Sequence, residues 1–289
     1  MWQGNIGACQ SLVEFRACDG RSSPERGNAV SGIGSAIRSL GLALSGRTLE
    51  PFALPAPSRP LWVIGDVHGY AHLLERLLVQ IAARTPRHKV DIVLAGDYVD
   101  RGPDSAAVLS LVHELSQTDP HITCLLGNHE EMMMAFLDDP IMNCRRWLRH
   151  GGYETLRSYG IRAEGIVDWN AGMRDVAARL RDAIGPDILT WLSERPLQWS
   201  SGNVYVVHAG MDPVCAPAEQ TRHTQLWGHP AFFTTPRSDG IWVVHGHSIV
   251  DRPGISGRGR IAVDTGVFQS QRLTGVLITP DGGVTPYSS

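Results

Sequence analysis

Three short apolar runs between residues 61 and 130 each end in glycine and then in side chains that ligate metals or transfer protons. They read LWVIGDVHG from Leu61, DIVLAGDYVDRG from Asp91 and TCLLGNHEE from Thr123. Carboxylates, imidazoles and an amide oxygen form a mixed ligand set that suits Mn, Fe or Zn. Two such metals can hydrolyse a phosphoester, because they clamp the attacking and leaving oxygens and lower the pKa of a bound water. The residue types therefore predict metal-dependent phosphoester hydrolysis.

These side chains need strands to bring them together. The apolar runs at Leu61–Ile64, Val90–Leu94 and Ile122–Leu126 are typical of strands in a sheet that is covered on both faces. Open α/β sheets place ligands just beyond the carboxyl ends of their strands. We therefore expect one edge of the sheet to gather eight polar residues: Asp66, His68, Asp97, Asp100, Arg101, Asn128, His129 and Glu130.

Helices are predicted between these strands, from about Ala71 to Ala83 and over Ser105–Leu115, because leucine and valine recur there at helical spacing. Strand, helix, strand is a βαβ unit. From about residue 131 to 200 the pattern is helical, which predicts an inserted cap. Strands return in the last third, and we expect them to form a second sheet packed on the first: Val204–Val207, Ile241–Val244, Arg260–Val263 and Thr274–Ile278.

The predicted fold class is thus α/β, a two-sheet sandwich flanked by helices over residues 61–289. Residues 1–60 differ, since they are rich in Gly, Ser, Arg and Pro and end in PFALPAPSRP, which is typical of an extended linker. Isoleucine and leucine recur at helical spacing within them, at Ile33, Ile37, Leu40 and Leu44. This extension either contains one short amphipathic helix or lacks regular structure.

The composition is that of an ordinary globular protein, with 43% apolar and 19% charged residues and a formal net charge of −3. Nothing in it predicts a nucleic-acid or membrane surface. No apolar run is long enough to cross a bilayer, and the start lacks the pattern of a secretory signal. The five cysteines are scattered and form no CxxC pair, so we expect reduced thiols and a cytoplasmic location.

The motifs GDVHG, GDYVDRG and GNHE resemble those of the phosphoprotein phosphatase branch of the calcineurin-like metallophosphoesterases. Three motifs in the right order make this resemblance specific, although it does not cover residues 1–60. The segment WLRHGGYETLRSYG from Trp147 resembles one in bacterial members of the family. The resemblance implies a metallophosphoesterase fold with a helical insertion.

The resemblance also implies two divalent metal ions, most simply Mn, with Fe or Zn as alternatives. Asp97 would bridge them, and a hydroxide between them would attack phosphorus in line, without a phospho-enzyme. The ligands of the first metal would be Asp66, His68 and Asp97, and those of the second Asp97, Asn128, His208 and His247. In the HGH motif, alignment favours His247 over His245.

Three further roles follow from the same motifs. His129 would protonate the leaving oxygen as general acid, Asp100 would orient His129, and Arg101 would bind phosphate oxygens. One departure concerns LWGHP from Leu226, because many relatives carry a second phosphate-binding arginine after Leu-Trp. Here we expect His229 to take that role, unless Arg222 or Arg237 reaches the site instead.

The predicted function is a phosphomonoesterase of the serine/threonine protein phosphatase type, with phosphotyrosine as a further substrate. Its partner would be a phosphoprotein or a small phosphorylated molecule. Symmetrical dinucleoside tetraphosphatases share all three motifs, so cleavage of a phosphoanhydride is an alternative. A catalytically silent phosphopeptide-binding module is a third hypothesis, which the loss of a ligand or of His129 would favour.

Overall fold

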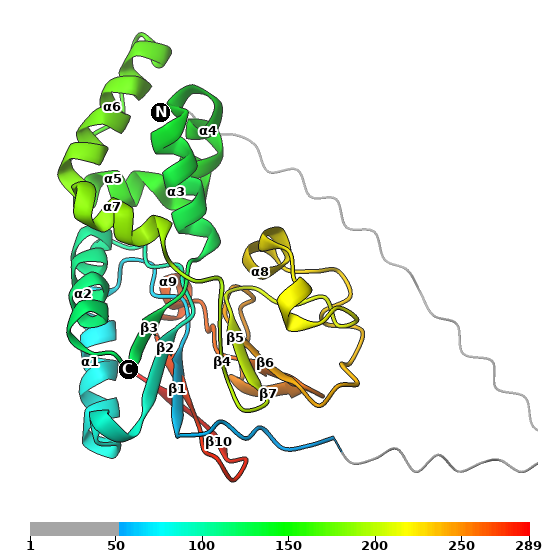
Figure 1. The fold of residues 1–289 in the computed structure, drawn as a ribbon. Helices are drawn as coiled ribbons and strands as arrows, with labels where there is room; N and C mark the ends of the chain where they lie inside the picture. The colour runs from blue at the N-terminus through cyan, green and yellow to red at the C-terminus, as the bar shows by residue number, and fades with distance from the viewer. Residues whose placement is uncertain (1–51) are drawn as a thin grey trace, which may run out of the picture. The chain divides into compact units, whose positions relative to one another are not determined.

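The computed structural model describes residues 52–289 (Figure 1). The candidate helix around Ile37 and most of the predicted extension therefore lie outside the described residues. Two five-stranded sheets pack against each other, with helices on the outer face of the first sheet and more helices at one end. The predicted two-sheet α/β architecture is confirmed.

The first sheet has the strand order β10-β9-β1-β2-β3. Its first three strands in the sequence are parallel, whereas β9 pairs antiparallel with both β1 and β10. All three predicted apolar runs form these parallel strands, with ends that differ by at most two residues from prediction. The strands are β1 (Leu61–Ile64), β2 (Asp91–Leu94), β3 (Ile122–Cys124), β9 (Thr274–Ile278) and β10 (Val284–Ser288).

The second sheet has the order β4-β5-β6-β8-β7, with β5, β6 and β8 parallel and antiparallel strands at both edges. The prediction that Thr274–Ile278 belongs to this sheet is wrong. That strand pairs with β1, since Ile278 lies opposite Leu61, and this long-range register leaves no local signal in the sequence. The strands are β4 (Gln198–Ser201), β5 (Val204–Val207), β6 (Trp242–His245), β7 (Gly254–Gly257) and β8 (Arg260–Ala262).

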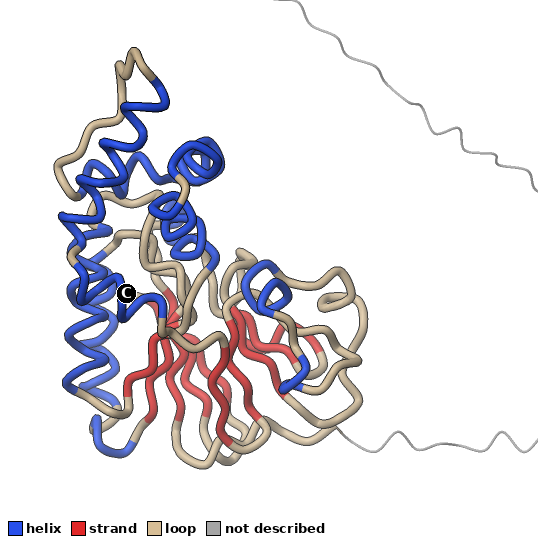
Figure 2. The backbone as a smooth tube through the Cα atoms, turned by 45° about the horizontal axis from the view of Figure 1, so that its top comes forward, coloured by secondary structure: helices blue, strands red, loops and turns tan. Residues whose placement is uncertain are grey.

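The alternation of side chains along β1 divides the core into two layers. Leu61 and Val63 face the second sheet and pack in one cluster with Val206 and Val244. Trp62 and Ile64 point the opposite way, into the core beneath the helices. Helices α1 (Ala71–Arg84) and α2 (Ser105–Thr118) cover this outer face, as the tube view shows (Figure 2).

The helical insertion begins directly at the end of β3 and rises beyond the carboxyl ends of the parallel strands (Figure 1). Its helices are α3 (Asn128–Asp138), α4 (Pro140–Trp147), a π-helical turn (Leu148–Gly152), α5 (Tyr153–Ser158), α6 (Trp169–Ile184) and α7 (Pro186–Ser193). The predicted helical character is confirmed, but it ends at Ser193 and not near residue 200, where β4 already pairs with β5.

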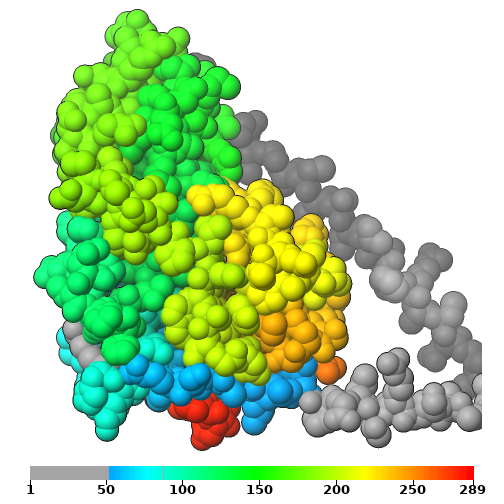
Figure 3. Space-filling view, in the orientation of Figure 1, coloured from blue at the N-terminus to red at the C-terminus, as the bar shows by residue number. Residues whose placement is uncertain are grey.

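Two short helices complete the fold near the site, α8 (Arg222–Trp227) and α9 (Val267–Ser270). The space-filling view shows the insertion in green beside the segment around α8 in yellow (Figure 3). The start of the described chain packs on the second sheet, where Phe52 contacts the Trp242 ring and the carbonyl of Ala53 accepts its indole N–H at 2.7 Å. No helix in residues 52–289 has the length and apolar character of a membrane span.

Candidate active site

Two clusters of potential metal ligands meet at Asp97, which follows β2. One comprises His68, Asp97 and His129, the other Asp97, His208 and His247, and the ligand atoms of each cluster lie within 4.8 Å of one another. His68 Nε2 lies 3.7 Å from one Asp97 oxygen, and His208 Nε2 lies 3.4 Å from the other. The geometry therefore suits a carboxylate that bridges two cations.

Asp66 and Asn128 complete the predicted ligand set. The Asn128 amide oxygen lies 2.7 Å from His208 Nε2 and 3.0 Å from His247 Nδ1. The Asp66 carboxylate accepts the backbone N–H of His247 at 3.1 Å. All six residues predicted as ligands thus lie together, although they come from the ends of β1, β2, β3, β5 and β6.

The protonation of these groups fits divalent cations. Burial lowers the pKa of His68 and of His208, so both imidazoles are neutral, which is the form that binds metals. Burial raises the pKa of Asp66 and of Asp97, and nearby carboxylates such as Asp264 and Glu130 add to the effect. A cation would relieve this repulsion. His68 Nδ1 bonds the carbonyl oxygen of Val99 at 2.9 Å, which leaves Nε2 as the ligating atom.

Backbone strain is concentrated at the same residues. Six non-glycine residues in the described chain have positive φ, and five of them are predicted site residues: His68, Asp97, Asp100, Arg101 and His247. Such conformations cost of order 1–3 kcal/mol each and persist only where surrounding contacts enforce them. Glycine is required beside them, because a Cβ on Gly127 would lie 2.2 Å from Asp97 Oδ1.

Glu130 supplies much of that enforcement. Its buried carboxylate accepts four backbone N–H groups, from Asp97 and Gly127 on one oxygen and from Tyr98 and Val99 on the other, at 2.7–3.1 Å. It therefore ties the loop after β2 to the start of α3.

His129 and Asp100 form a buried dyad beside the first cluster. His129 Nδ1 lies 2.7 Å from Asp100 Oδ2, so Nε2 faces Asp97, at 3.8 Å. Burial raises the pKa of Asp100 to about 8, against hydrogen bonds from Thr155 and Trp147 that lower it. Burial also lowers the pKa of His129. The carboxyl proton of Asp100 can then be shared with Nδ1, which leaves the proton of the neutral imidazole at Nε2, in reach of an oxygen bound at the clusters.

Two partners of Asp100 were not found by sequence reasoning. The Thr155 hydroxyl donates to Asp100 at 2.7 Å, and the Trp147 indole N–H donates at 3.1 Å. Neither residue is among the predicted site residues. Both come from the insertion, 47 and 55 residues further along the chain, so motif spacing could not identify them. Their location in the segment resembling bacterial relatives was the only available signal.

Arg101 lies where phosphate oxygens could reach it. Its guanidinium is 3.2 Å from His68 Nε2 and stacks 4.4 Å from the centre of the Phe268 ring. Gly151 of the insertion fixes its backbone, since the Gly151 carbonyl accepts the Arg101 N–H at 3.3 Å. A Cβ on Gly151, whose φ is 107°, would lie 2.5 Å from that nitrogen.

The residues considered for a second phosphate contact lie elsewhere. His229 has Nε2 3.7 Å from Asp212, and no described contact links it to the clusters. Arg237 is buried in an ion pair with Asp239, and Arg222 pairs with Glu131 at 2.9 Å. The role of His229 therefore stays a prediction, and Arg237 is engaged in holding its own loop.

His245 and Asp264 lie near the site but are not part of the ligand clusters. His245 is buried against the ring of Phe232, at 5.0 Å between centroids, and belongs to neither cluster. Asp264 lies beside Asp66, and its negative charge raises the pKa of Asp66.

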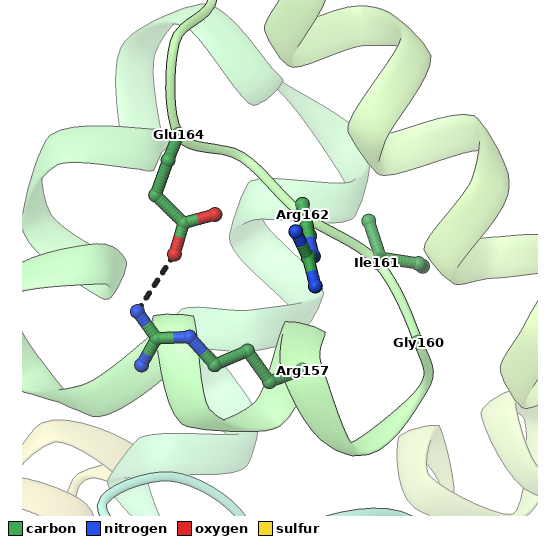
Figure 4. Close-up of a pocket in the computed structure, with 5 residues that line it drawn as sticks. All are labelled: Arg157, Gly160, Ile161, Arg162 and Glu164. Atoms are coloured by element: carbon green, nitrogen blue, oxygen red, sulfur yellow. Dashed lines mark hydrogen bonds and ion pairs between the residues drawn. The ribbon is translucent and has the colours of Figure 1, made fainter.

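A pocket of about 640 Å³ lies in the insertion, away from the clusters, where Arg157 pairs with Glu164 (Figure 4). No residue lining it belongs to the clusters.

Comparison with known proteins identifies the family. The model of the calcineurin-like phosphoesterases matches residues 59–263, which is well over half of the chain. The chain belongs to the calcineurin-like phosphoesterase family. This assignment confirms the resemblance drawn from the three motifs and makes the protein a phosphoesterase.

Relatives of this calcineurin-like phosphoesterase differ in substrate. It is 37% identical to serine/threonine-protein phosphatase 2 of Escherichia coli (strain K12), over 32% of the chain and only 39% of that relative. It is 25% identical to the asymmetrical bis(5'-nucleosyl)-tetraphosphatase PrpE of Bacillus velezensis, over 74% of the chain and 86% of the relative. Similarity therefore extends over more of the tetraphosphatase.

Solved structures share the fold. A putative diadenosine tetraphosphatase superposes with a TM-score of 0.54 at 22% identity, covering 82% of this chain and 96% of that one. A cold-active protein-tyrosine phosphatase from a Shewanella species gives 0.51 at 18% identity, covering 79% and 80%. These likenesses establish the fold of this phosphoesterase and leave its substrate open.

The four hydrogen bonds to the Glu130 carboxylate predict an effect on stability. In the Glu130→Gln variant, an amide NH₂ would face two backbone N–H donors, so the free energy of unfolding should fall by about 1–3 kcal/mol. Urea denaturation measures it. The exposed Glu114→Gln on α2 is the matched control and should change stability by less than about 0.5 kcal/mol. Equal stability of both variants would contradict a stabilising role for the hydrogen bonds to Glu130.

The Thr155 contact predicts a catalytic effect without loss of metal. Thr155→Val keeps the shape of the side chain but removes the donor to Asp100, so kcat should fall about 10-fold. Initial rates and metal analysis of the same preparation provide the test, with the exposed Thr190→Val on α7 as control. An unchanged kcat would show that Thr155 does not act through Asp100.

Proposed function

We propose that the protein is a metal-dependent phosphomonoesterase that hydrolyses phosphoserine and phosphothreonine in proteins. The observation that carries this proposal is the 2.7 Å His129–Asp100 dyad, buried beside the shared carboxylate of Asp97. Serine and threonine leave as alkoxides, which are strong bases and need a proton in the transition state. Cleavage of a phosphoanhydride expels a phosphate, which needs that proton far less. A general acid in the site therefore meets the requirement of an ester substrate, while tetraphosphatases that share the three motifs keep the anhydride as the second candidate.

The chain's own residues define the mechanism. Asp66, His68, Asp97, Asn128, His208 and His247 would hold two divalent cations, which when bound supply a water of lowered pKa and a clamp on the phosphoryl group. Arg101 binds the phosphate oxygens through its forked N–H donors. Asp100 shares a proton with His129 Nδ1, so the other ring nitrogen, Nε2, can carry the proton that passes to the leaving oxygen.

Manganese is the proposed metal. The donors are carboxylates, imidazoles and an amide oxygen without a thiolate, a set that suits Mn, Fe or Zn. A zinc-dependent endopolyphosphatase of Saccharomyces cerevisiae is 28% identical over 52% of this chain and 46% of its own length. Zinc and iron are therefore the alternatives that metal analysis should include. A cytoplasmic location and a phosphoprotein partner also remain proposals.

A dinucleoside tetraphosphate is the second candidate substrate. Its support is the extent of similarity, because the matches to PrpE cover 86% of that protein whereas those to the protein phosphatase cover 39%. A symmetrical tetraphosphatase of Acidovorax is also 31% identical, over 53% of this chain and 44% of its own length. The silent binding module has less support, since every predicted ligand and His129 lie together.

The dyad predicts how activity depends on the leaving group. In His129→Asn, turnover of a phosphoserine peptide should fall about 10²–10⁴-fold, the usual contribution of a general acid. Turnover of p-nitrophenyl phosphate should fall less, because its leaving group is stable without a proton. Initial rates with manganese measure both, and diadenosine tetraphosphate is assayed in parallel.

His88→Asn is the matched control, because His88 is exposed in the short turn Arg87–Lys89 before β2 and belongs to neither cluster. Faster turnover of diadenosine tetraphosphate than of any phosphopeptide in the parent enzyme would contradict the peptide substrate. Full activity of His129→Asn on the peptide would contradict the general-acid role itself.

A further inference from the structure

An arginine of the insertion stacks on a tryptophan of α8. The Arg146 guanidinium in the last turn of α4 lies 4.4 Å from the centre of the Trp227 ring. Cation–π contact of this kind fixes the plane of a guanidinium while leaving its N–H groups free at the rim. Among the described residues, no hydrogen bond or salt bridge engages the Arg146 side chain, which is exposed. The contact therefore presents a positioned, unpaired cation.

Glu131 holds the tryptophan in place. Its carboxylate accepts the Trp227 indole N–H at 2.7 Å and the Arg222 Nε–H at 2.9 Å. Both contacts join α3 to α8, so they connect the insertion to the segment after β5. Since these donors already satisfy the Glu131 carboxylate, its negative charge is balanced locally. The positive charge of Arg146 therefore stays available for another partner.

The stacked pair lies beside the reaction centre. The Trp227 ring is 6.4 Å from the ring of His247, a predicted metal ligand, and Trp147, the neighbour of Arg146, donates to Asp100. A pocket of about 290 Å³ opens along Arg146 and Glu131, between α3 and α4. The distance from the His247 ring to the Trp227 ring and the distance from the Trp227 ring to the Arg146 guanidinium can be added together. Their sum is about the length of three residues of extended peptide, at roughly 3.3–3.6 Å each.

We propose that Arg146, stacked on Trp227, binds the carboxylate of an acidic residue within about three positions of the phosphoresidue. It is a specificity-determining residue, and the enzyme prefers acidic phosphopeptides. This inference rests on the proposed phosphopeptide substrate. The supporting observation is charge complementarity, because Arg101 in the site and the unpaired Arg146 beside it both carry a positive charge.

The chemistry favours a carboxylate that Arg146 can bind with two parallel N–H donors. Stacking has already restricted the guanidinium, so little further freedom is lost when the carboxylate binds. The pair is exposed to solvent and screened by salt, which limits its effect. A preference of about fivefold in kcat/KM is therefore expected, and most of it should lie in KM.

The test compares two phosphoserine peptides that differ only in their flanks, with glutamate or glutamine at two positions on each side. For the parent enzyme, kcat/KM should be about fivefold higher on the glutamate peptide, and this ratio should shrink in 0.5 M salt. Arg146→Met should bring the ratio close to one, and Arg146→Lys should restore part of it. Arg145→Met is the control, because it removes the same charge from the same helix without touching Trp227.

Equal rates on the two peptides in the parent enzyme would overturn the inference while leaving the proposed function intact. The same ratio in Arg146→Met and in the parent would also overturn it. Turnover of neither peptide, with diadenosine tetraphosphate hydrolysed, would refute the proposed function and this inference with it. If Arg146→Met lowers only the dinucleotide rate, the pair contacts nucleotide and the peptide assignment is wrong.

Discussion

The burial of Asp97 is the constraint on which the rest of the site depends. Its carboxylate lies among further buried acids, Asp66, Asp100 and Glu130, all at most 3% exposed. Ionised carboxylates are costly to bury unless cations or N–H donors compensate them. Glu130 receives four backbone donors, and Asp100 receives the dyad histidine, a threonine and an indole. Within residues 52–289, Asp66 and Asp97 each accept only one backbone N–H, from His247 and His129 respectively, which leaves a divalent cation as their natural partner.

The two sheets and the insertion contribute different parts of the site. The sheets deliver ligands from the carboxyl ends of five strands to one edge, which is how α/β proteins bring distant residues together. The insertion contributes contacts that no strand could supply, because Thr155 and Trp147 reach Asp100 from above while Gly151 fixes the backbone of Arg101. The insertion is thus part of the candidate active site, beyond serving as a cap, and the stacking of its Arg146 on Trp227 extends that site towards α8.

The sequence predicted the parts of this arrangement that have a local signal. Apolar runs located β1, β2 and β3 within two residues, and the motifs after these strands and after β5 and β6 contain the six proposed ligands. Pairing between strands distant in the sequence was not predictable, so β9 was assigned to the wrong sheet and β4, β7 and β10 were not predicted as strands. The partners of Asp100 and the contact of Arg146 with Trp227 also depend on packing between remote helices. Sequence periodicity carries no information about such contacts.

Metal stoichiometry is the measurement that tests the central claim most directly. The parent protein and Asp97→Asn would be loaded with manganese, freed of excess metal and analysed by plasma mass spectrometry, alongside their turnover of a phosphoserine peptide. The account predicts two ions per parent chain and fewer than one in the variant, because losing the shared carboxylate weakens both clusters. Two tightly bound ions in Asp97→Asn would contradict a bridging role for Asp97 and the account built on it.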